Sequence, residues 1–345
     1  MTDFPLLQPG RTFVIAEIGV NHNGDPALAR QLIDVAKEAG ADAVKFQTFK
    51  ADKLVAASAE KARYQMENHA VAESQRDMIR RYELSEGDLR DLHSYCQDAG
   101  VRFLSTPFDE DSAALLDSLD VAAFKVSSGD LTAVQFLEDL ASYNRPVILS
   151  SGMADMAECE TAVRVLRDVA PDLPVAILHC VSLYPAPIEF ANLRAIPAMC
   201  DHLAIPVGWS DHTTDSTTAV AAVALGARIL EKHFTLSRDM EGPDHRASLE
   251  PAELKAYIQS VRDTDAALGT GEKVPAAPEL DTIAAARRSL VLAEAVRQGE
   301  PIGTHRLLVQ RPGTGLAPAR LEEAASRTAA RDLPAGHVLQ DADLA

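Results

Sequence analysis

The chain has 345 residues, with 51 acidic against 33 basic residues and a formal net charge of −18. This negative balance argues against a general nucleic-acid-binding protein, because binding to the phosphate backbone relies on clustered lysine and arginine. The longest apolar-rich run, at about 216–230, is interrupted by Gly226 and Arg228 and is too short to span a bilayer. We therefore expect a globular protein whose partners are neither nucleic acids nor membranes.

The N-terminus and the cysteines indicate the compartment. The first residues, MTDFPLLQPG, lack the basic segment and apolar core of a secretory signal peptide. The four cysteines show no CxxC spacing and no clustering, which is typical of reduced thiols rather than of a disulfide or zinc framework. The expected location is cytoplasmic.

The first 235 residues alternate short β-rich runs with helical stretches. Residues 26–40 and 85–100 have apolar residues at helical spacing and end in glycine, and Ser85 with Asp88 has the pattern of an N-cap. The β-rich runs, in chain order, are TFVIAEIG, DAVKFQTF, RFLSTPF, AFKVSSGD, PVILSSGM, VAILHCVS, PVGWSDH and RILEKHF.

Strands that alternate with helices predict a parallel α/β sheet. Eight such units in roughly 250 residues favour a closed (β/α)8 TIM barrel. A doubly wound open sheet is the competing fold, but no GxGxxG follows the first run. Residues 50–83 form a long connection, which is typical of a lid or binding loop.

The composition changes after about residue 270. GTGEKVPAAPELD is rich in Pro, Gly and charge and indicates a linker. We expect a barrel over residues 1–275, a linker over 276–285 and a small β-rich domain over 286–345. Within that domain GEPIGTHRL and GHVLQDADL share their spacing of Gly and apolar residues, which predicts two similar turns.

The carboxyl ends of the strands form the active-site face of such a barrel. Each predicted strand end carries groups that can do chemistry. In chain order these are Glu17; Lys45 and Gln47; Ser105 and Thr106; Lys125, Ser127 and Ser128; Ser150 and Ser151; His179 and Ser182; Asp211 and His212; and Glu231, Lys232 and His233.

Two chemical groupings stand out among them. Lys45 and Lys125, with the hydroxyls of Ser128, Ser150 and Ser151, are suited to a phosphate or a carboxylate. His212 and His233 end the last two strands, which are neighbours in a barrel. Two neutral imidazoles with water and substrate oxygens suit a divalent ion such as Mn²⁺, Co²⁺ or Mg²⁺. The competing interpretation is that both histidines are ordinary core residues.

The motifs AEIGVNHNGD, VKFQTF, LSTPF, FKVSSGD, ILSSGM, HCVSLYPAP, GWSDHT, EKHFTL and GPDHRASLEP occur in one order over nearly the whole chain. They resemble the sialic acid synthases, which condense phosphoenolpyruvate with an N-acetylated hexosamine. The C-terminal part, with VQRPGTG, resembles the antifreeze-like (SAF) domain of that family, a β-clip fold.

The resemblance implies roles for individual residues. It implies a metal held by His212 and His233, with Mn²⁺ favoured over Mg²⁺ and Co²⁺, and a homodimer in which Arg311 reaches the partner subunit's active site. It implies a catalytic site of Glu17, His212 and His233. The implied phosphoenolpyruvate-binding residues are Lys45, Thr106, Lys125, Ser128, Ser150 and Ser151, and the implied sugar-binding residues are Gln47, Ser182, Tyr184, Asp244 and Arg311.

Two sugars remain open at this point: N-acetylmannosamine, which gives N-acetylneuraminate, and a 2,4-diacetamido-2,4,6-trideoxymannose, which gives N,N'-diacetyllegionaminate. KFQTFKADKLV with KARYQ leans toward the second. Two other functions also remain open. One is a Schiff-base aldolase with Lys45 or Lys125 as nucleophile, and the other is a non-catalytic sugar-binding barrel.

Overall fold

The computed structural model describes residues 4–56, 59 and 74–345. The chain forms two compact units, Met1–Gly269 and Thr270–Ala345. The division falls directly after the last barrel helix, whereas the expected boundary lies at residue 275.

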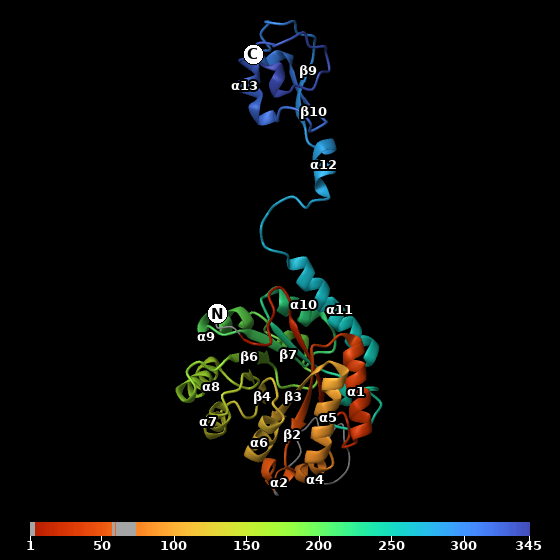
Figure 1. The fold of residues 1–345 in the computed structure, drawn as a ribbon, viewed down its shortest axis with the longest axis vertical. Helices are drawn as coiled ribbons and strands as arrows, with labels where there is room; N and C mark the ends of the chain where they lie inside the picture. Colours follow the sequence, from red (N-terminus) through yellow and green to blue (C-terminus); the bar gives the residue numbers. More distant parts are fainter. Residues whose placement is uncertain (1–3, 57–58, 60–73) are drawn as a thin grey trace. The chain divides into compact units, whose positions relative to one another are not determined.

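The first unit is a closed barrel of eight parallel strands, and the predicted TIM-barrel fold is confirmed (Figure 1). Each strand pairs with the next in sequence, and the last pairs with the first. Each predicted β-rich run contains one of them. The strands are β1 (Phe13–Gly19), β2 (Ala43–Thr48), β3 (Arg102–Pro107), β4 (Phe124–Val126), β5 (Val147–Ser150), β6 (Val175–Cys180), β7 (Val207–Asp211) and β8 (Ile229–His233).

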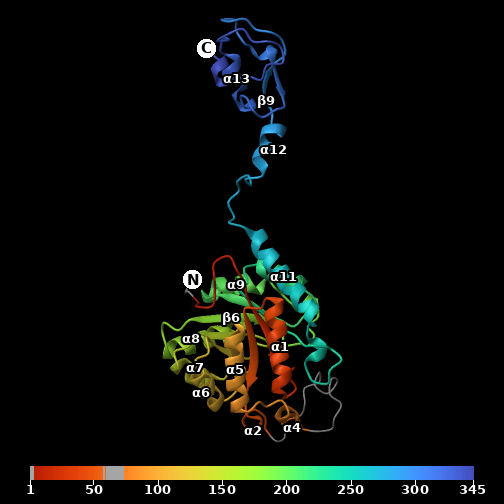
Figure 2. The ribbon, with the colours of Figure 1, turned by 45° about the vertical axis from the view of Figure 1, so that its right-hand side comes forward.

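Helices form an outer layer around these strands (Figures 1 and 2). Both helices predicted from periodicity are present, and Ser85 caps the second in a capping box with Asp88. The helices that follow successive strands are α1 (Pro26–Ala39), α5 (Glu86–Ala99), α6 (Glu110–Ser118), α7 (Val134–Ser142), α8 (Met156–Val169), α9 (Ala195–Leu203), α10 (Thr217–Ala224) and α11 (Pro251–Leu268). None of the helices in the described ranges combines the length and hydropathy needed to cross a bilayer.

Strand alternation divides the barrel's apolar residues into two cores. Val14, Val44 and other outward residues pack against the helices. Ile15, Ile148 and Ile229 belong to a smaller apolar cluster with other strand residues that point into the barrel. Toward the carboxyl ends of the strands, the residues that point into the barrel change from apolar to polar. The polar side chains of the strand ends therefore share the barrel's mouth.

The long connection after β2 contains two short helices, α2 (Ala51–Leu54) and α4 (Gln75–Arg80). The KARYQ segment, residues 61–65, lies outside the described residues.

The C-terminal unit has its own hydrophobic core. It contains α12 (Glu279–Ala286), the antiparallel strands β9 (Ser289–Leu292) and β10 (Leu307–Gln310), and α13 (Leu321–Ala325). Residues 276–285, expected to be a linker, lie largely in α12. Three alanines and the acidic first-turn residues Glu279 and Asp281 favour that helix.

The two similar turns expected in this unit have the same backbone form. Gly299 and Gly336 have φ of +80° and +78°. The apolar residues three positions later, Ile302 and Leu339, are both fully buried. A 3-10 turn follows each, at Thr304–Arg306 and Asp341–Asp343.

Candidate active site

A cavity of about 690 Å³ opens at the carboxyl ends of the barrel strands. Most of the residues predicted from the strand ends and the resemblance line it. They are Glu17, Lys45, Gln47, Thr106, Lys125, Ser128, Ser150, Ser182, Tyr184, His212, His233 and Asp244.

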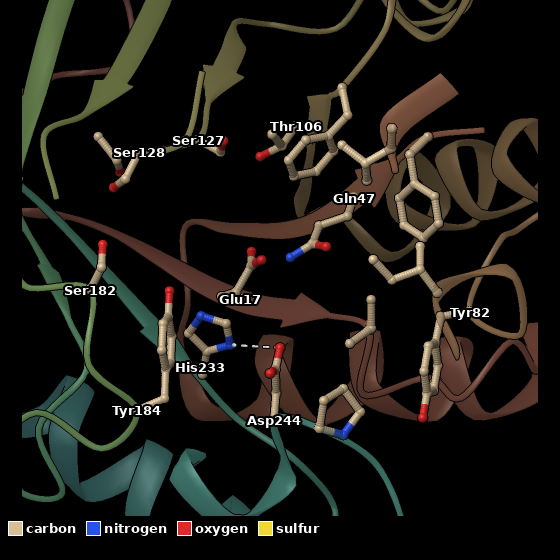
Figure 3. Close-up of a pocket in the computed structure, with 18 of the residues that line it drawn as sticks. Glu17, Gln47, Tyr82, Thr106, Ser127, Ser128, Ser182, Tyr184, His233 and Asp244 are labelled. Atoms are coloured by element: carbon tan, nitrogen blue, oxygen red, sulfur yellow. Dashed lines mark ion pairs between the residues drawn. The ribbon is translucent and has the colours of Figure 1, made fainter. Parts of the chain in front are cut away.

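Strand register explains how residues far apart in sequence meet there. Glu17 lies opposite Lys45 in the β1–β2 pairing and opposite His233 in the β1–β8 pairing. Because side chains alternate between the two faces of a strand, positions at equal height point into the barrel together. Figure 3 shows Glu17 in the middle of the cavity wall, with Gln47 on one side and His233 on the other.

Two lysines and two glutamates form a buried cluster of charges. The Nζ of Lys45 lies 2.8 Å from Oε2 of Glu17 and 3.9 Å from Oε2 of Glu231. The Nζ of Lys125 lies 3.7 Å from Oε1 of Glu231. Lys45 also donates to Oγ1 of Thr106 at 3.0 Å. The glutamates hold both ammonium groups facing the cavity, where they can meet an anionic substrate.

Burial and neighbouring charge tune these groups differently. Burial raises the pKa of Glu17 to about 7, against the opposing attraction of Lys45. Burial also favours a higher pKa for Glu231, but Lys125 and Lys45 outweigh it and lower that pKa. Burial lowers the pKa of Lys125. Glu17 can therefore exchange a proton near neutral pH, while Glu231 stays ionised.

Hydroxyl groups from the β4, β5 and β6 ends converge beside Lys125. Its Nζ donates to Oγ of Ser150 at 2.7 Å. The backbone N–H of Gly152 donates to Oγ of Ser128 at 3.0 Å. A Cβ on Gly152 would lie 2.2 Å from Oγ of Ser182 and 2.7 Å from Oγ of Ser128. Any larger residue at this position would force these hydroxyls to move.

Ser151, expected to bind phosphoenolpyruvate, lies away from the cavity. Its hydroxyl donates to the carbonyl of Leu178 at 2.9 Å, and the residue does not line the cavity. Ser150 ends β5 facing inward, so the next residue faces away from the cavity. Arg311 belongs to the C-terminal unit, where its Nε donates to the carbonyl of Ala286 at 3.0 Å.

The two histidines from β7 and β8 lie together, with ring centroids 5.4 Å apart. Nδ1 of His212 is 2.8 Å from the carbonyl of Val181, so it carries the proton and donates. In the neutral form of this ring the remaining lone pair is on Nε2, which can then bind a ligand. The Tyr184 ring packs on His212 at 4.1 Å between centroids.

His233 is buried and its Nδ1 has no hydrogen-bond partner among the described residues. Its Nδ1 lies 3.9 Å from Oδ2 of Asp244, the pair joined by a dashed line in Figure 3. Burial lowers the pKa of His233 well below its usual value. The ring is therefore neutral, as a metal ligand must be.

These donors fit a divalent metal only in part. A neutral imidazole with an unpartnered nitrogen and a second imidazole with a free Nε2 are good ligands. Within residues 4–56, 59 and 74–345, no three His, Cys, Asp or Glu side chains gather as a metal site. Any metal held by His212 and His233 would take its remaining ligands from substrate and water.

Glu231 and Ser210 also line the cavity. Glu231 sits between the two lysines, and Ser210 donates to its Oε1 at 3.2 Å. The sequence places Glu231 at a strand end but assigns it no role. Its spacing from His233, two residues apart on one strand, is the signal that both face the same way.

Other strand-end residues face outward from the barrel. The His179 ring lies 5.1 Å from that of Trp209, and its Nε2 meets the carbonyl of Ala191 at 2.9 Å. Lys232 is fully buried, with its Nζ 3.3 Å from Oδ1 of Asp211. These side chains support the barrel wall and do not line the cavity.

The chain is similar to proteins of known activity. It is 43% identical over 330 residues to the N,N'-diacetyllegionaminic acid synthase of Legionella pneumophila, which covers 95% of this chain and 93% of the relative. It is 40% identical to the enzyme of the same name from Campylobacter jejuni, over 96% of this chain and 99% of the relative. The crystal structure of the N-acetylneuraminic acid synthetase of Leptospira borgpetersenii, in complex with citrate, matches with 33% identity and a TM-score of 0.69. It covers 79% of this chain and 90% of that chain.

Family models match both units of the chain. Residues 287–345 match the SAF domain, which confirms the expected C-terminal domain. Residues 32–273 match the NeuB family. With this match over most of the barrel and two relatives at 40% identity or more over nearly the full length, the chain belongs to the NeuB family.

Proposed function

We propose that the protein is a nonulosonic acid synthase. It joins phosphoenolpyruvate to an open-chain acetamido-hexose and releases phosphate, and N,N'-diacetyllegionaminic acid is the favoured product. The observation that most strongly supports this function is the cavity, in which two buried lysines and several hydroxyls lie beside two histidines. The relatives named for this product, at 40–43% identity, support the same choice.

In this proposal one end of the cavity binds phosphoenolpyruvate. Lys45 and Lys125 neutralise its phosphate and carboxylate, and Thr106, Ser128 and Ser150 donate hydrogen bonds to the oxygens. Ser182 and Gln47 line the space beside this anion site. Because the lysines are already held by Glu17 and Glu231, little reorganisation is needed when the anion enters.

The reaction then needs an electrophile, a water and a leaving phosphate. C3 of phosphoenolpyruvate attacks the aldehyde carbon of the sugar, water adds at C2, and the C2–O bond to phosphate breaks. A divalent metal, proposed as Mn²⁺, would supply Lewis acidity at the aldehyde oxygen when bound to His212 and His233. Glu17, with a pKa of about 7, accepts a proton from the attacking water and returns it to the alkoxide formed from the aldehyde. The proton of the new C2 hydroxyl leaves with the phosphate as the ketone forms. Tyr184 and Asp244 orient the sugar.

The test is phosphate release from phosphoenolpyruvate, with a panel of acetamido-sugars, with and without Mn²⁺. Release that requires a sugar supports the synthase, and no release with any sugar refutes it. Excess chelator, His212→Ala and His233→Ala should each abolish turnover while the protein stays folded. Manganese binding to the apoprotein, followed by electron paramagnetic resonance, should be lost in both variants. Full activity under chelation would contradict the metal site.

A Schiff-base aldolase is the second candidate, because burial lowers the pKa of Lys125 and makes its amine more available. Borohydride reduction with substrate separates the two. A Schiff-base enzyme is trapped as a stable adduct of increased mass, while a synthase that acts without a covalent lysine intermediate stays unmodified.

A further inference from the structure

A separate hydrophobic cluster forms one side of the cavity. It is small and distinct from the two barrel cores. We call it the apolar wall. Its members, each of which lines the cavity, are Val20, Phe49, Leu54, Met78, Ile79, Tyr82 and Phe108.

The apolar wall comes from connections rather than from the barrel strands. Val20, Phe49 and Phe108 directly follow β1, β2 and β3, while the other members lie on or beside α2 and α4. Small hydrophobic clusters often pack beneath long loops without binding anything. This one differs because all of its members contact the cavity. Figure 3 shows Tyr82 on the opposite side of Gln47 from Ser128 and Ser182.

Positive charge lies at the other end. Among the described residues that line the cavity, the lysines and arginines are Lys45 and Lys125. Lys45 pairs with Glu17, and both lysines pair with Glu231. The cavity therefore has a charged end suited to an anion and an apolar end suited to methyl groups. The amides of Gln47 and Gln75 also line it and can meet the polar atoms of an acetamido group.

We propose that the apolar wall receives the C4 acetamido methyl and the C6 methyl of a 2,4-diacetamido-2,4,6-trideoxyhexose. It thereby selects this sugar over N-acetylmannosamine, which has hydroxyl groups on both carbons. The proposal rests on the proposed function. Placing the aldehyde carbon near the two histidines directs the far carbons of the sugar away from them. A methyl group gains from burial against the wall, whereas a hydroxyl there loses its hydrogen bonds to water.

The experiment compares kcat/KM for three sugars with the full-length protein. They are N-acetylmannosamine, its 6-deoxy derivative, and 2,4-diacetamido-2,4,6-trideoxymannose. Each group that fills an apolar pocket is worth about 10- to 200-fold in kcat/KM. We expect kcat/KM to rise in that order, with one step from the C6 methyl and another from the C4 acetamido group.

Two variants test the wall itself. Ile79→Asn and Leu54→Asn change half-buried members, so the fold should tolerate them. Each should reduce the preference for the diacetamido sugar about tenfold, mainly through that sugar's KM, and leave the KM for phosphoenolpyruvate unchanged. The matched control is Met153→Asn. Met153 lines the same cavity but lies outside the wall and is 75% exposed.

The outcomes separate this proposal from the proposed function. Turnover of all three sugars with similar kcat/KM would overturn the wall's role and leave the synthase intact. No phosphate release with any sugar would refute the synthase itself. An equal loss of preference in Met153→Asn would also overturn the wall, because the effect would not be specific to the cluster.

Discussion

At the scale of single residues, the cavity depends on charges removed from water. Lys45 and Lys125 are 3% and 2% exposed, and each faces a glutamate within 4 Å. Buried charges of this kind are costly unless they remain paired. In the proposed reaction the anionic groups of phosphoenolpyruvate also pair with these lysines. Loss of either lysine should therefore weaken phosphoenolpyruvate binding more than sugar binding.

Lys45→Met and Lys125→Met should each weaken phosphoenolpyruvate binding by roughly 2–5 kcal/mol, because removing one partner leaves a buried charge unpaired. The KM for the sugar should change far less. Steady-state kinetics with each substrate varied in turn measures both effects. Lys53→Met, at a half-exposed lysine on α2, is the control and should alter neither. Equal losses for both substrates would indicate general misfolding instead.

Gly152→Ala would place a methyl group between the hydroxyls of Ser128 and Ser182. Both hydroxyls would have to turn away, and the anion would lose the hydrogen bond proposed from Ser128, worth about 1.5–3 kcal/mol. We expect a raised KM for phosphoenolpyruvate in a folded protein. Gly129→Ala, which also lines the cavity but has its nearest neighbour at 3.6 Å, should behave like the wild type. An unchanged KM in Gly152→Ala would exclude the Ser128 hydroxyl from the anion site.

At the scale of elements, the ends of β7 and β8 are joined on the outside of the barrel. Lys232 pairs with Asp211 and donates to the carbonyl of Thr213. The Tyr257 hydroxyl, from α11, donates to Oδ2 of Asp211 at 3.1 Å. These contacts fix the two strand ends that carry His212 and His233.

Lys232→Met should lower the free energy of unfolding by about 3–5 kcal/mol, because it leaves the carboxylate of Asp211 buried without its cation. The double variant Lys232→Met/Asp211→Asn should recover part of that loss. Urea unfolding of the wild type, both single variants and the double variant gives the coupling energy. Strictly additive losses would mean that the pair does not act as one unit.

The turn after β1 makes stability depend on pH. Burial lowers the pKa of His22 to about 4, and its Nδ1 accepts from the backbone N–H of Gly24. The unfolded chain takes up this proton near its ordinary pKa of 6.5, so it binds more protons than the folded chain between pH 6.5 and 4. Stability is therefore complete above pH 6.5 and falls as the pH drops.

From pH 7.5 to pH 5, this one histidine should cost about 2 kcal/mol of folding free energy. His22→Gln removes the titrating group, so its stability should fall less over the same range. Urea unfolding at the two pH values measures the difference. Identical pH dependence in wild type and variant would show that His22 is not the responsible group.

At the scale of the whole molecule, the chain divides into a barrel and a SAF domain, each with its own core. Domains of this small size have limited cores and gain stability by docking on a larger surface. A homodimer in which Arg311 completes the partner subunit's sugar site is our proposal from the family resemblance. The planar guanidinium suits this task because it can donate to two oxygens at once.

The test is complementation between inactive chains. Arg311→Ala and His212→Ala should each be nearly inactive alone. A mixed dimer would carry one site with both defects and one with neither, so mixing should restore part of the activity. Subunit exchange has to be verified with tagged chains. If the subunits exchange and no activity returns, Arg311 acts within its own chain or takes no part in the reaction.

The sequence by itself determined the barrel, its strands and most residues of the cavity. Strand-and-helix alternation is a local signal, and polar residues at strand ends stand out against apolar runs. Which of two neighbouring residues faces the cavity required the tertiary structure, as Ser151 shows. Barrel strands are buried on both faces, so no alternation of apolar and polar residues marks the inner side. The Glu231 contacts and the apolar wall join segments far apart in sequence, and only the closure of the barrel brings them together.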